Sequence, residues 1–443
     1  MTAEPASIFG GSRITRLFLL IPPALVLLVA ALTPTSALYP DQGDVGLYLM
    51  KARDVASGLL PYRDLSFEYP PAALIPMLAP YLAGFSTALE LDAYKVLFAG
   101  WEAVLLLALG VVVGRIGERV GNANALPRLI VVTIGALLAI TWRYDLFPAL
   151  LTAIAVWAAI ERRPAVVGFA LGLGVLAKLY PIALLPALAL PWLVPFDLGR
   201  LVRLGATFGL TLLLGLLPFV LVAGDDAFAF LGYQVGRGLQ IESIGGGVAV
   251  LAGLLGGQAP RLSFGFSAVQ VEGPLARALL GILPVLTVIL FGLLAWLGWR
   301  RARGELAGAG QVDEIHGEAA AGGVRPGTVL TIVFASLLVL LVTSKVYSIQ
   351  YVVWIVPFVA LLRGWQFWLG ATIVALTMPI HPILYADLVR QEPLPILVLN
   401  LRNALVVALT AWLLWDLGRS PSRDGAAAEG GGEHRRERTS EGP

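Results

Sequence analysis

Residues 104–163 read VLLLALGVVV GRIGERVGNANALPR LIVVTIGALLAITW RYD LFPALLTAIAVWAAI ERR, with spaces separating the apolar segments from the charged ones. Apolar runs of 14 to 23 residues recur from Leu17 to Trp415. Runs of that length fit membrane-spanning helices and exclude an outer-membrane barrel, whose strands are alternating segments of ~10 residues. The stretch therefore predicts consecutive membrane helices joined by short, arginine-rich loops.

The composition also indicates an integral membrane protein. Of the 443 residues, 58% are hydrophobic and 14% charged, whereas a soluble domain carries roughly a quarter charged residues. The chain has no cysteine, which excludes disulfides, cysteine-ligated zinc and a thiol nucleophile. Its three histidines lie far apart in the sequence and do not suggest a metal cluster. The net charge of +2 gives no indication of nucleic-acid binding.

These runs predict an all-α, polytopic protein with about twelve transmembrane helices. The predicted spans are 17–32, 93–113, 129–142, 146–160, 165–177, 179–195, 202–223, 276–298, 328–343, 350–362, 365–380 and 395–415. The first span also resembles a secretory signal, but we expect an uncleaved helix. An even number of spans puts both termini on one side, and 19 of the 31 lysines and arginines then lie there. The positive-inside rule makes that side the cytoplasm of a multi-pass cell-membrane protein.

The spans divide the chain into predicted regions. These are a cytoplasmic N-terminus (1–16), a transmembrane domain (17–417) with outer segments 39–91 and 224–275 and a flexible cytoplasmic loop (300–327), and a disordered cytoplasmic tail (418–443). The run Pro71–Gly84 is too short to span and contains three prolines, so we expect an interfacial helix in the first outer loop. We also expect an interfacial helix in the glycine-rich run Gly245–Gly257 of the second outer segment.

Charged residues collect at the predicted outer face. All four lysines fall there: Lys51, Lys95, Lys178 and Lys345. Because the positive-inside rule disfavours this, an anionic ligand is the economical explanation, with interfacial anchoring as the alternative for the last two. Arg143 and Asp145 either neutralise each other or serve a site.

The acids of the first outer loop suggest catalysis, with simple solvation of a surface loop as the alternative. An acceptor hydroxyl that attacks a glycosyl phosphate needs a general base, usually a carboxylate. The departing phosphate needs fixed cations or a metal. An acidic loop above basic helix ends supplies both kinds of group.

Several strings spread along the chain resemble a known family. They are Asp44 with Tyr48, the segments 58–64, 68–71, 177–181 and 344–351, and Trp354 with Pro357. Together they are similar to polytopic bacterial glycosyltransferases of the GT-C class, in particular the mannosyl- and arabinofuranosyltransferase branch that uses polyprenyl-phosphate sugars. The resemblance implies an inverting transfer of a hexose or pentose, mannose-like as the best guess, to a lipid or glycan acceptor at the outer face.

The resemblance also implies roles for individual residues. Asp44 is expected to act as the base, with Asp41 as its competitor. Lys178 and Lys345 match basic positions that suit the donor phosphate. Further phosphate candidates, chosen by placement, are Arg143, Arg237 and Arg402, and acceptor or loop candidates are Asp64, Glu68, Tyr48, Tyr62, Tyr69 and Tyr233. No ligand spacing demands a metal; if a divalent ion is required, Asp44 and Glu68 are its expected ligands.

Two other functions stay open from the sequence. A secondary transporter or flippase for an anionic lipid-linked substrate would suit twelve spans, and Glu102, deep in a span, is the acid that such a protein would use. Against it, transporters usually carry internal repeats and polar groups near the bilayer midplane. A non-catalytic scaffold of an envelope-synthesis complex is the third alternative.

Overall fold

The computed structural model describes residues 13–34, 44–86, 89–316 and 323–419. Each of the predicted spans is helical, in some cases with a break or a short 3-10 turn. The helices are α1 (Arg13–Leu32), α4 (Leu91–Arg119), α5 (Ala125–Gly135), α6 (Leu137–Trp142), α7 (Leu146–Ile160), α8 (Pro164–Ala177), η4 (Tyr180–Leu184), α9 (Leu185–Leu193), α10 (Leu198–Ala223), α13 (Pro274–His316), α14 (Pro326–Thr343), η6 (Ile349–Tyr351), α15 (Val352–Leu361), α16 (Gly364–Met378) and α18 (Pro393–Gly418). Within the described ranges, five helices are long and apolar enough to cross a membrane. The helical, polytopic membrane fold is confirmed.

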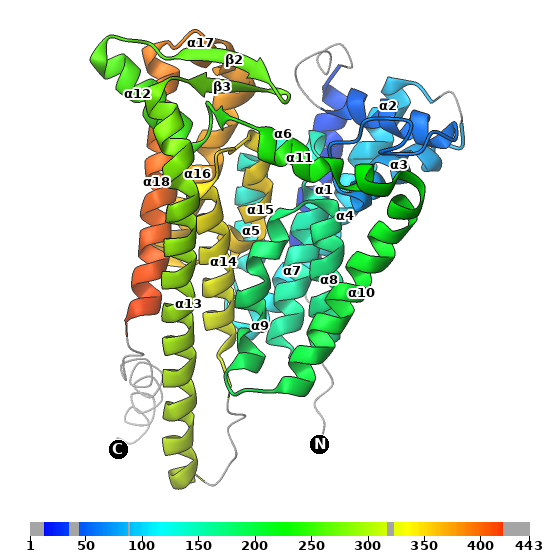
Figure 1. The fold of residues 1–443 in the computed structure, drawn as a ribbon. Coiled ribbons are helices and arrows are strands. Elements are labelled where there is room, and N and C mark those ends of the chain that lie inside the picture. The colour runs from blue at the N-terminus through cyan, green and yellow to red at the C-terminus, as the bar shows by residue number, and fades with distance from the viewer. Residues whose placement is uncertain (1–12, 35–43, 87–88, 317–322, 420–443) are drawn as a thin grey trace, which may run out of the picture.

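The remaining elements lie together at one end of the long helices, which we call the cavity end (Figure 1). They are α2 (Val45–Ala56), η3 (Pro71–Ala73), α3 (Leu74–Ala83), η5 (Gly224–Phe228), α11 (Ala229–Gly236), β1 (Leu239–Gln240), α12 (Ile244–Gly256), β2 (Arg261–Gly265), β3 (Ala268–Glu272), η7 (Pro379–Ile383) and α17 (Tyr385–Val389). Both short apolar runs, 71–84 and 245–257, are helical and belong to this group.

A small antiparallel sheet was not predicted. Its strands have the order β1-β3-β2, and β2 and β3 have five residues each. Phe266 and Ser267 join them with φ angles of 53° and 54°, the backbone of a tight hairpin turn. Strands this short leave too brief an alternation in the sequence to be distinguished from a loop.

Helix α13 extends beyond its predicted span. The segment 300–327 was predicted to be flexible, but the helix continues through it as far as His316. Glu305 ties this extension to the next helix, because its buried carboxylate accepts hydrogen bonds from the backbone N–H of Arg325 (2.9 Å) and the hydroxyl of Thr328 (2.6 Å). A helix therefore occupies the first part of the segment, where the sequence analysis expected none, and the flexibility of the segment stays a prediction.

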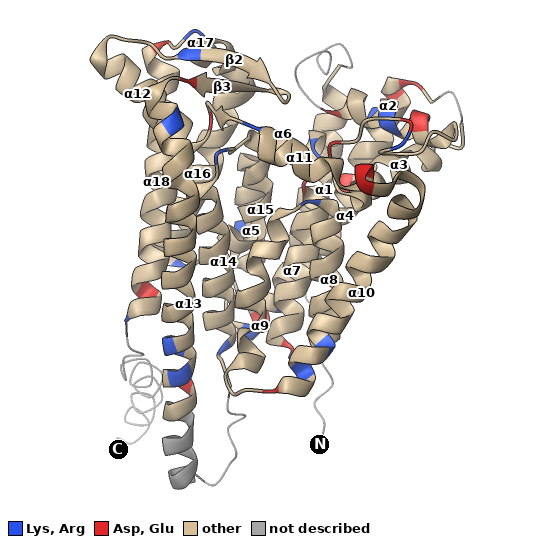
Figure 2. Ribbon diagram, in the orientation of Figure 1, with Lys and Arg blue, Asp and Glu red and all other residues tan. Residues whose placement is uncertain are grey.

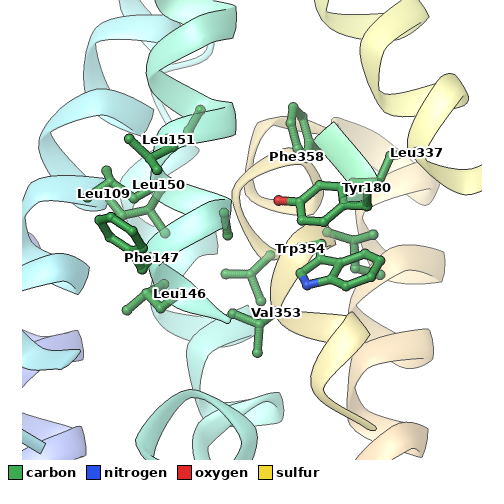
Figure 3. Close-up of a cluster of buried hydrophobic side chains, with 14 of the residues drawn as sticks. Leu109, Leu146, Phe147, Leu150, Leu151, Tyr180, Leu337, Val353, Trp354 and Phe358 are labelled. Carbon is green, nitrogen blue, oxygen red and sulfur yellow. The ribbon is translucent and has the colours of Figure 1, made fainter. Parts of the chain in front are cut away.

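The apolar core is centred on α7. Twelve of its fifteen residues are buried, so this helix contacts other helices rather than lipid. Figure 3 shows Phe147 and Leu150 beside Leu109 of α4, while Val353 and Phe358 of α15 belong to the same buried cluster on the other side of the view. A helix that is apolar all round is the expected composition for this central position.

Helix α10 packs on α8 through glycines. An added Cβ at Gly168 would lie 2.4 Å from the carbonyl oxygen of Leu204, and one at Gly172 would lie 2.9 Å from Cβ of Thr211. Glycines four residues apart let two helix backbones approach closely, as in membrane helix pairs. The rest of α10 is largely exposed and apolar, which suits contact with lipid.

Charged residues lie mainly at the two ends of the helices, as Figure 2 shows. At the end opposite the cavity, arginines bind main-chain carbonyls at helix ends. Arg128 donates to the carbonyl of Leu362 (2.6 Å), and Arg301 donates to that of Arg419 (2.7 Å). Terminal carbonyls lack partners within their own helix, so these contacts satisfy them.

Candidate active site

A cavity of about 410 Å³ lies at the cavity end, where several helices stop beneath the elements that cover them. Helices α6 and α8 end directly before Arg143 and Lys178, which both have extended backbones. Asp44 and Asp145 stand directly before the first residues of α2 and α7. The helix dipole favours cations at C-termini and anions at N-termini, so each charge suits its position. The starts and ends of four helices thus bring four charges together.

The helix that carries Lys178 to the cavity is short. Its 14 residues correspond to a length of about 21 Å, against ~30 Å for the hydrocarbon core of a bilayer. Its other end follows Arg162 and Arg163. The helix is therefore shorter than the hydrocarbon core is thick.

Asp44 forms an ion pair with Arg143 through its Oδ2 atom, which also accepts a hydrogen bond from the Tyr48 hydroxyl (3.3 Å). Burial alone would raise the pKa of Asp44, but Arg143, with a smaller contribution from Lys178, outweighs it and lowers the pKa below its usual value. Among the described residues no hydrogen bond reaches Oδ1, and about a third of the side chain (32%) is exposed. Asp44 therefore presents an ionised carboxylate oxygen to the cavity.

Lys178 is held by a second, more buried ion pair. Its Nζ lies 2.6 Å from Oδ1 of Asp145, which also accepts a hydrogen bond from the indole N–H of Trp354 (2.6 Å). The ammonium group also lies 5.0 Å from the ring centre of Tyr144 and 5.6 Å from that of Trp354. Burial lowers the pKa of Lys178 although Asp145 favours the charged form. The sequence allowed Arg143 and Asp145 to neutralise each other; each instead pairs with a different residue.

Other residues that line the cavity come from later parts of the chain. They include Arg237 after α11, Gln240 in β1, Glu242 before α12, and Tyr351 in η6. Arg237 forms no ion pair with any residue in the described ranges, and its guanidinium lies 5.9 Å from the ring centre of Tyr233. Arg237 is thus the lining cation without an ion pair among the described residues, although it donates a hydrogen bond to the Tyr351 hydroxyl and its charge acts on Glu242.

Glu242 is a functional candidate that the sequence analysis missed. It is 5% exposed and lines the cavity, and burial raises its pKa to about 7 despite the opposing effect of Arg402. Ser243 follows it and caps α12, accepting a hydrogen bond from the N–H of Gly246 (2.9 Å). The signal in the sequence was an acid placed directly before a serine N-cap and a glycine-rich helix.

The remaining predicted residues fall into two groups. Those that line the cavity are Asp44, Glu68, Tyr69, Arg143, Lys178, Tyr233 and Arg237. Those outside its lining are Tyr48, Tyr62, Asp64, Lys345 and Arg402. Asp41 lies outside the described residues. Tyr48 still acts on the site, because its hydroxyl donates to Asp44.

The residues outside the lining have partners in the protein. Tyr62 donates to the carbonyl of Tyr69 (2.6 Å), and Asp64 pairs with Arg63 in an exposed turn (2.8 Å). Arg402, 1% exposed, donates to the carbonyl of Glu242 (2.6 Å) and lies 4.0 Å from the ring centre of Tyr347. These contacts orient the loops around the cavity.

Three of the four lysines bind main-chain carbonyls. Lys51 donates to the carbonyl of Ser66 (2.5 Å), Lys95 to that of Thr33 (2.7 Å) and Lys345 to that of Val235 (2.8 Å). Their presence at this end therefore has a structural reason that needs no anionic ligand. Lys178 is the lysine that lines the cavity.

Two further sequence candidates have defined surroundings. Glu102 is fully buried in α4, does not line the cavity, and neither carboxyl oxygen has a hydrogen-bond partner in the described part of the chain. No group of three or more histidine, aspartate or glutamate side chains among the described residues is arranged to hold a metal ion. Asp44 and Glu68 both line the cavity, so they stay the expected ligands if a metal is required.

Comparison with known proteins gives distant matches. No protein-family model matches the chain, and no curated protein matches it in sequence. The chain is similar to crystal structures of ArnT from Cupriavidus metallidurans, each with 15% identity and 92% of this chain covered. The apo state has a TM-score of 0.45 and 77% of its own chain covered, and the form bound to undecaprenyl phosphate has 0.46 and 78%. We draw no functional conclusion from so distant a likeness.

Proposed function

We propose that this chain is a membrane glycosyltransferase. It would move a hexose or pentose, with mannose as the first sugar to test, from a polyprenyl-phosphate donor to a lipid or glycan acceptor at the outer face of the cell membrane. The observation that carries the proposal is a cavity at the ends of apolar helices that presents one ionised carboxylate oxygen, on Asp44, and one cation without an ion pair among the described residues, Arg237.

Asp44 would act as the general base through an ionised carboxylate, although the ion pair with Arg143 lowers its pKa and with it its strength as a base. Its Oδ1 atom would accept the proton of the acceptor hydroxyl while that oxygen attacks the anomeric carbon of the donor sugar. The bond between the anomeric carbon and the phosphate oxygen breaks, and its electron pair leaves with the polyprenyl phosphate. Arg143 keeps Asp44 ionised and, with Tyr48, holds Oδ2, which leaves Oδ1 for the acceptor.

The lining cations have the properties that a phosphate leaving group requires. Fixed positive charges stabilise the charge that develops on the phosphate as the glycosidic bond breaks. Arg237 would make the direct contact, because Arg143 and Lys178 are each paired with a carboxylate and contribute through their position. A polyprenyl chain stays in the bilayer throughout, which explains why the site is built between membrane helices.

The alternative is a transporter or flippase for an anionic lipid-linked substrate. The observation in its favour is Glu102, a buried carboxyl group without a hydrogen-bond partner in the described ranges. An acid inside a membrane helix is costly and often functional. Glu102 does not line the cavity, however, so the two proposals depend on different residues and mutagenesis separates them.

The test is sugar transfer by purified protein in lipid vesicles. A panel of polyprenyl-phosphate sugars serves as donors and native membrane lipids serve as acceptors. Wild type is compared with Asp44→Asn, with Asp54→Asn as the matched control in the same helix, and with Glu102→Gln. Folding of each variant is checked by its thermal unfolding midpoint.

We expect transfer by wild type and by Asp54→Asn, and a loss of more than ~100-fold in Asp44→Asn, which is the lower range for removing a general base. Transfer that persists in Asp44→Asn would keep the enzyme and move the base to Asp41 or Glu68. Absence of transfer with every donor would overturn the glycosyltransferase proposal. Lipid flipping that Glu102→Gln abolishes would then establish the alternative.

A further inference from the structure

Glu242 is held in place at the cavity by three separate contacts. Its carboxylate Oε2 accepts a hydrogen bond from Nε2 of Gln240 (2.6 Å). Its main-chain carbonyl accepts one from the guanidinium of Arg402 (2.6 Å), and the next residue, Ser243, caps helix α12. A side chain fixed from both its head and its backbone has little freedom left to lose on binding a ligand.

Gln240 holds the carboxylate of Glu242, and the protein itself occupies all polar groups of its side chain. Its Nε2 also donates to the hydroxyl of Ser348 (2.9 Å), and its Oε1 accepts from the backbone N–H of Tyr347 (3.0 Å). Both hydrogens of the amide and its oxygen are therefore engaged by the protein. Gln240 lines the cavity but has no free group for a ligand. A ligand in this part of the cavity would therefore bind Glu242 instead.

The second carboxylate oxygen of Glu242 is available. Among the described residues, no hydrogen bond reaches Oε1, and the residue lines the cavity. A carboxylate oxygen accepts hydrogen bonds and, when protonated, also donates one. Hydroxyl groups are the neutral partners that match both states, whereas a phosphate would be repelled by the ionised form.

The lining groups differ in what they can still bind. Arg143 and Lys178 are each paired with a carboxylate, Asp44 and Asp145 respectively, whereas Glu242 keeps one carboxylate oxygen without a hydrogen bond in the described part of the chain. Arg237 lines the cavity without an ion pair in the described ranges and suits a phosphate. A ligand with a phosphate at one end and hydroxyl groups at the other has a partner for each end.

We infer that Glu242 is a specificity-determining residue that hydrogen-bonds a hydroxyl group of the donor sugar, with Gln240 and Arg402 as positioning residues. The inference rests on the proposed function for the identity of the ligand. A buried carboxyl that lacks its hydroxyl partner is left unsatisfied, so a sugar without that hydroxyl binds less well.

The test uses polyprenyl-phosphate donors that each lack one sugar hydroxyl. Wild type should penalise one deoxy donor in kcat/KM by about 10- to 100-fold relative to the others, the value expected for a hydrogen bond to a charged group. Glu242→Ala should remove that penalty at the same position and leave the ranking of the other donors unchanged. A merely structural role would slow all donors alike, and that result would overturn the inference.

Two additions keep the test decisive. If Glu242→Ala does not fold, Glu242→Met keeps the length of the side chain and cannot accept a hydrogen bond from a hydroxyl as a carboxylate does, so an unchanged donor ranking would then refute the inference. Binding is also measured, by quenching of tryptophan fluorescence, for polyprenyl-phosphate mannose against bare polyprenyl phosphate. If the variant loses the part of the affinity that depends on mannose and no transfer is seen, the role of Glu242 is supported and the glycosyltransferase proposal is rejected. If wild type binds both lipids with equal affinity, the role of Glu242 is rejected.

Discussion

The buried pair of Asp145 and Lys178 allows a sharp test of the electrostatics described above. The perturbation is Asp145→Asn, which removes the charge and keeps an oxygen that can accept the hydrogen bond from Trp354. The side chain of Asp145 is 1% exposed and that of Lys178 is 16% exposed, so water can reach the lysine only from the cavity that it lines. The variant leaves a lysine charge without its counter-charge inside the protein.

The expected loss of stability follows from two limits. Removing one partner of a buried ion pair costs about 3–5 kcal/mol. Lys178 can avoid this cost by losing its proton, and neutralising a lysine with an unfolded-state pKa near 10.4 costs about 4 kcal/mol at pH 7.5. We therefore expect Asp145→Asn to lower the free energy of unfolding by about 3–4 kcal/mol at pH 7.5.

The pH dependence gives the prediction its direction. Burial already lowers the pKa of Lys178 in wild type, and loss of Asp145 lowers it further. A group with a lowered pKa destabilises the folded state below its unfolded pKa, and this cost falls as the pH rises. At pH 9.5 the cost of neutralising the lysine is about 1 kcal/mol, so the variant should recover most of its stability there.

The assay is denaturant unfolding in mixed micelles, followed by circular dichroism at both pH values. Asp197→Asn is the matched control, because Asp197 forms an exposed pair with Arg200 (3.3 Å), and such pairs contribute at most ~1 kcal/mol. The double variant Asp145→Asn with Lys178→Met should return to within ~1 kcal/mol of wild type, since it removes both charges. A loss below ~1 kcal/mol for Asp145→Asn at pH 7.5, or a loss that does not shrink at pH 9.5, would refute the reasoning.

Two further predictions concern packing and titration. Gly168→Ala should destabilise the protein by about 1–3 kcal/mol, because the added Cβ would lie 2.4 Å from the carbonyl oxygen of Leu204. Gly205→Ala is the control and should be neutral or stabilising, because nothing lies within 4 Å of its added Cβ. Thermal unfolding of both variants tests this prediction. Burial raises the pKa of Glu242 from 4.5 to about 7, so the folded protein holds a proton on this residue that the unfolded chain releases. The free energy of unfolding of wild type should therefore fall by up to about 3 kcal/mol as the pH rises from 4.5 through 7. Glu242→Gln should lack that loss, and a constant difference in unfolding midpoint between pH 5 and 8 would contradict it.

The sequence predicted the helices well because lipid imposes a simple rule. A bilayer requires long apolar segments with internally satisfied backbones, and such segments are visible without knowledge of tertiary contacts. The strands β2 and β3 and the extension of α13 were not predicted. The strands are only five residues long, and the extension depends on Glu305 meeting Thr328 of another helix.

The candidate site was predicted in part. Asp44, Arg143 and Lys178 sit at helix ends, where the sequence pattern already placed charges, and all three line the cavity. Their pairing was not predictable, because it depends on how helices pack in space. Glu242 reaches the same cavity from 198 residues beyond Asp44 and 64 beyond Lys178, which no local pattern indicates.

The cavity is enclosed by two stretches of chain that are distant in sequence, one ending near residue 183 and the other beginning near 233. A molecule that contacts both stretches binds only when both are folded. Its free energy of binding is therefore added to the free energy of unfolding of the protein. At a ligand concentration 100 times its Kd, this linkage contributes about 2.7 kcal/mol. Occupancy of the site thus acts as a cross-link between the two halves of the molecule, and an occupied cavity makes them unfold as a single cooperative unit.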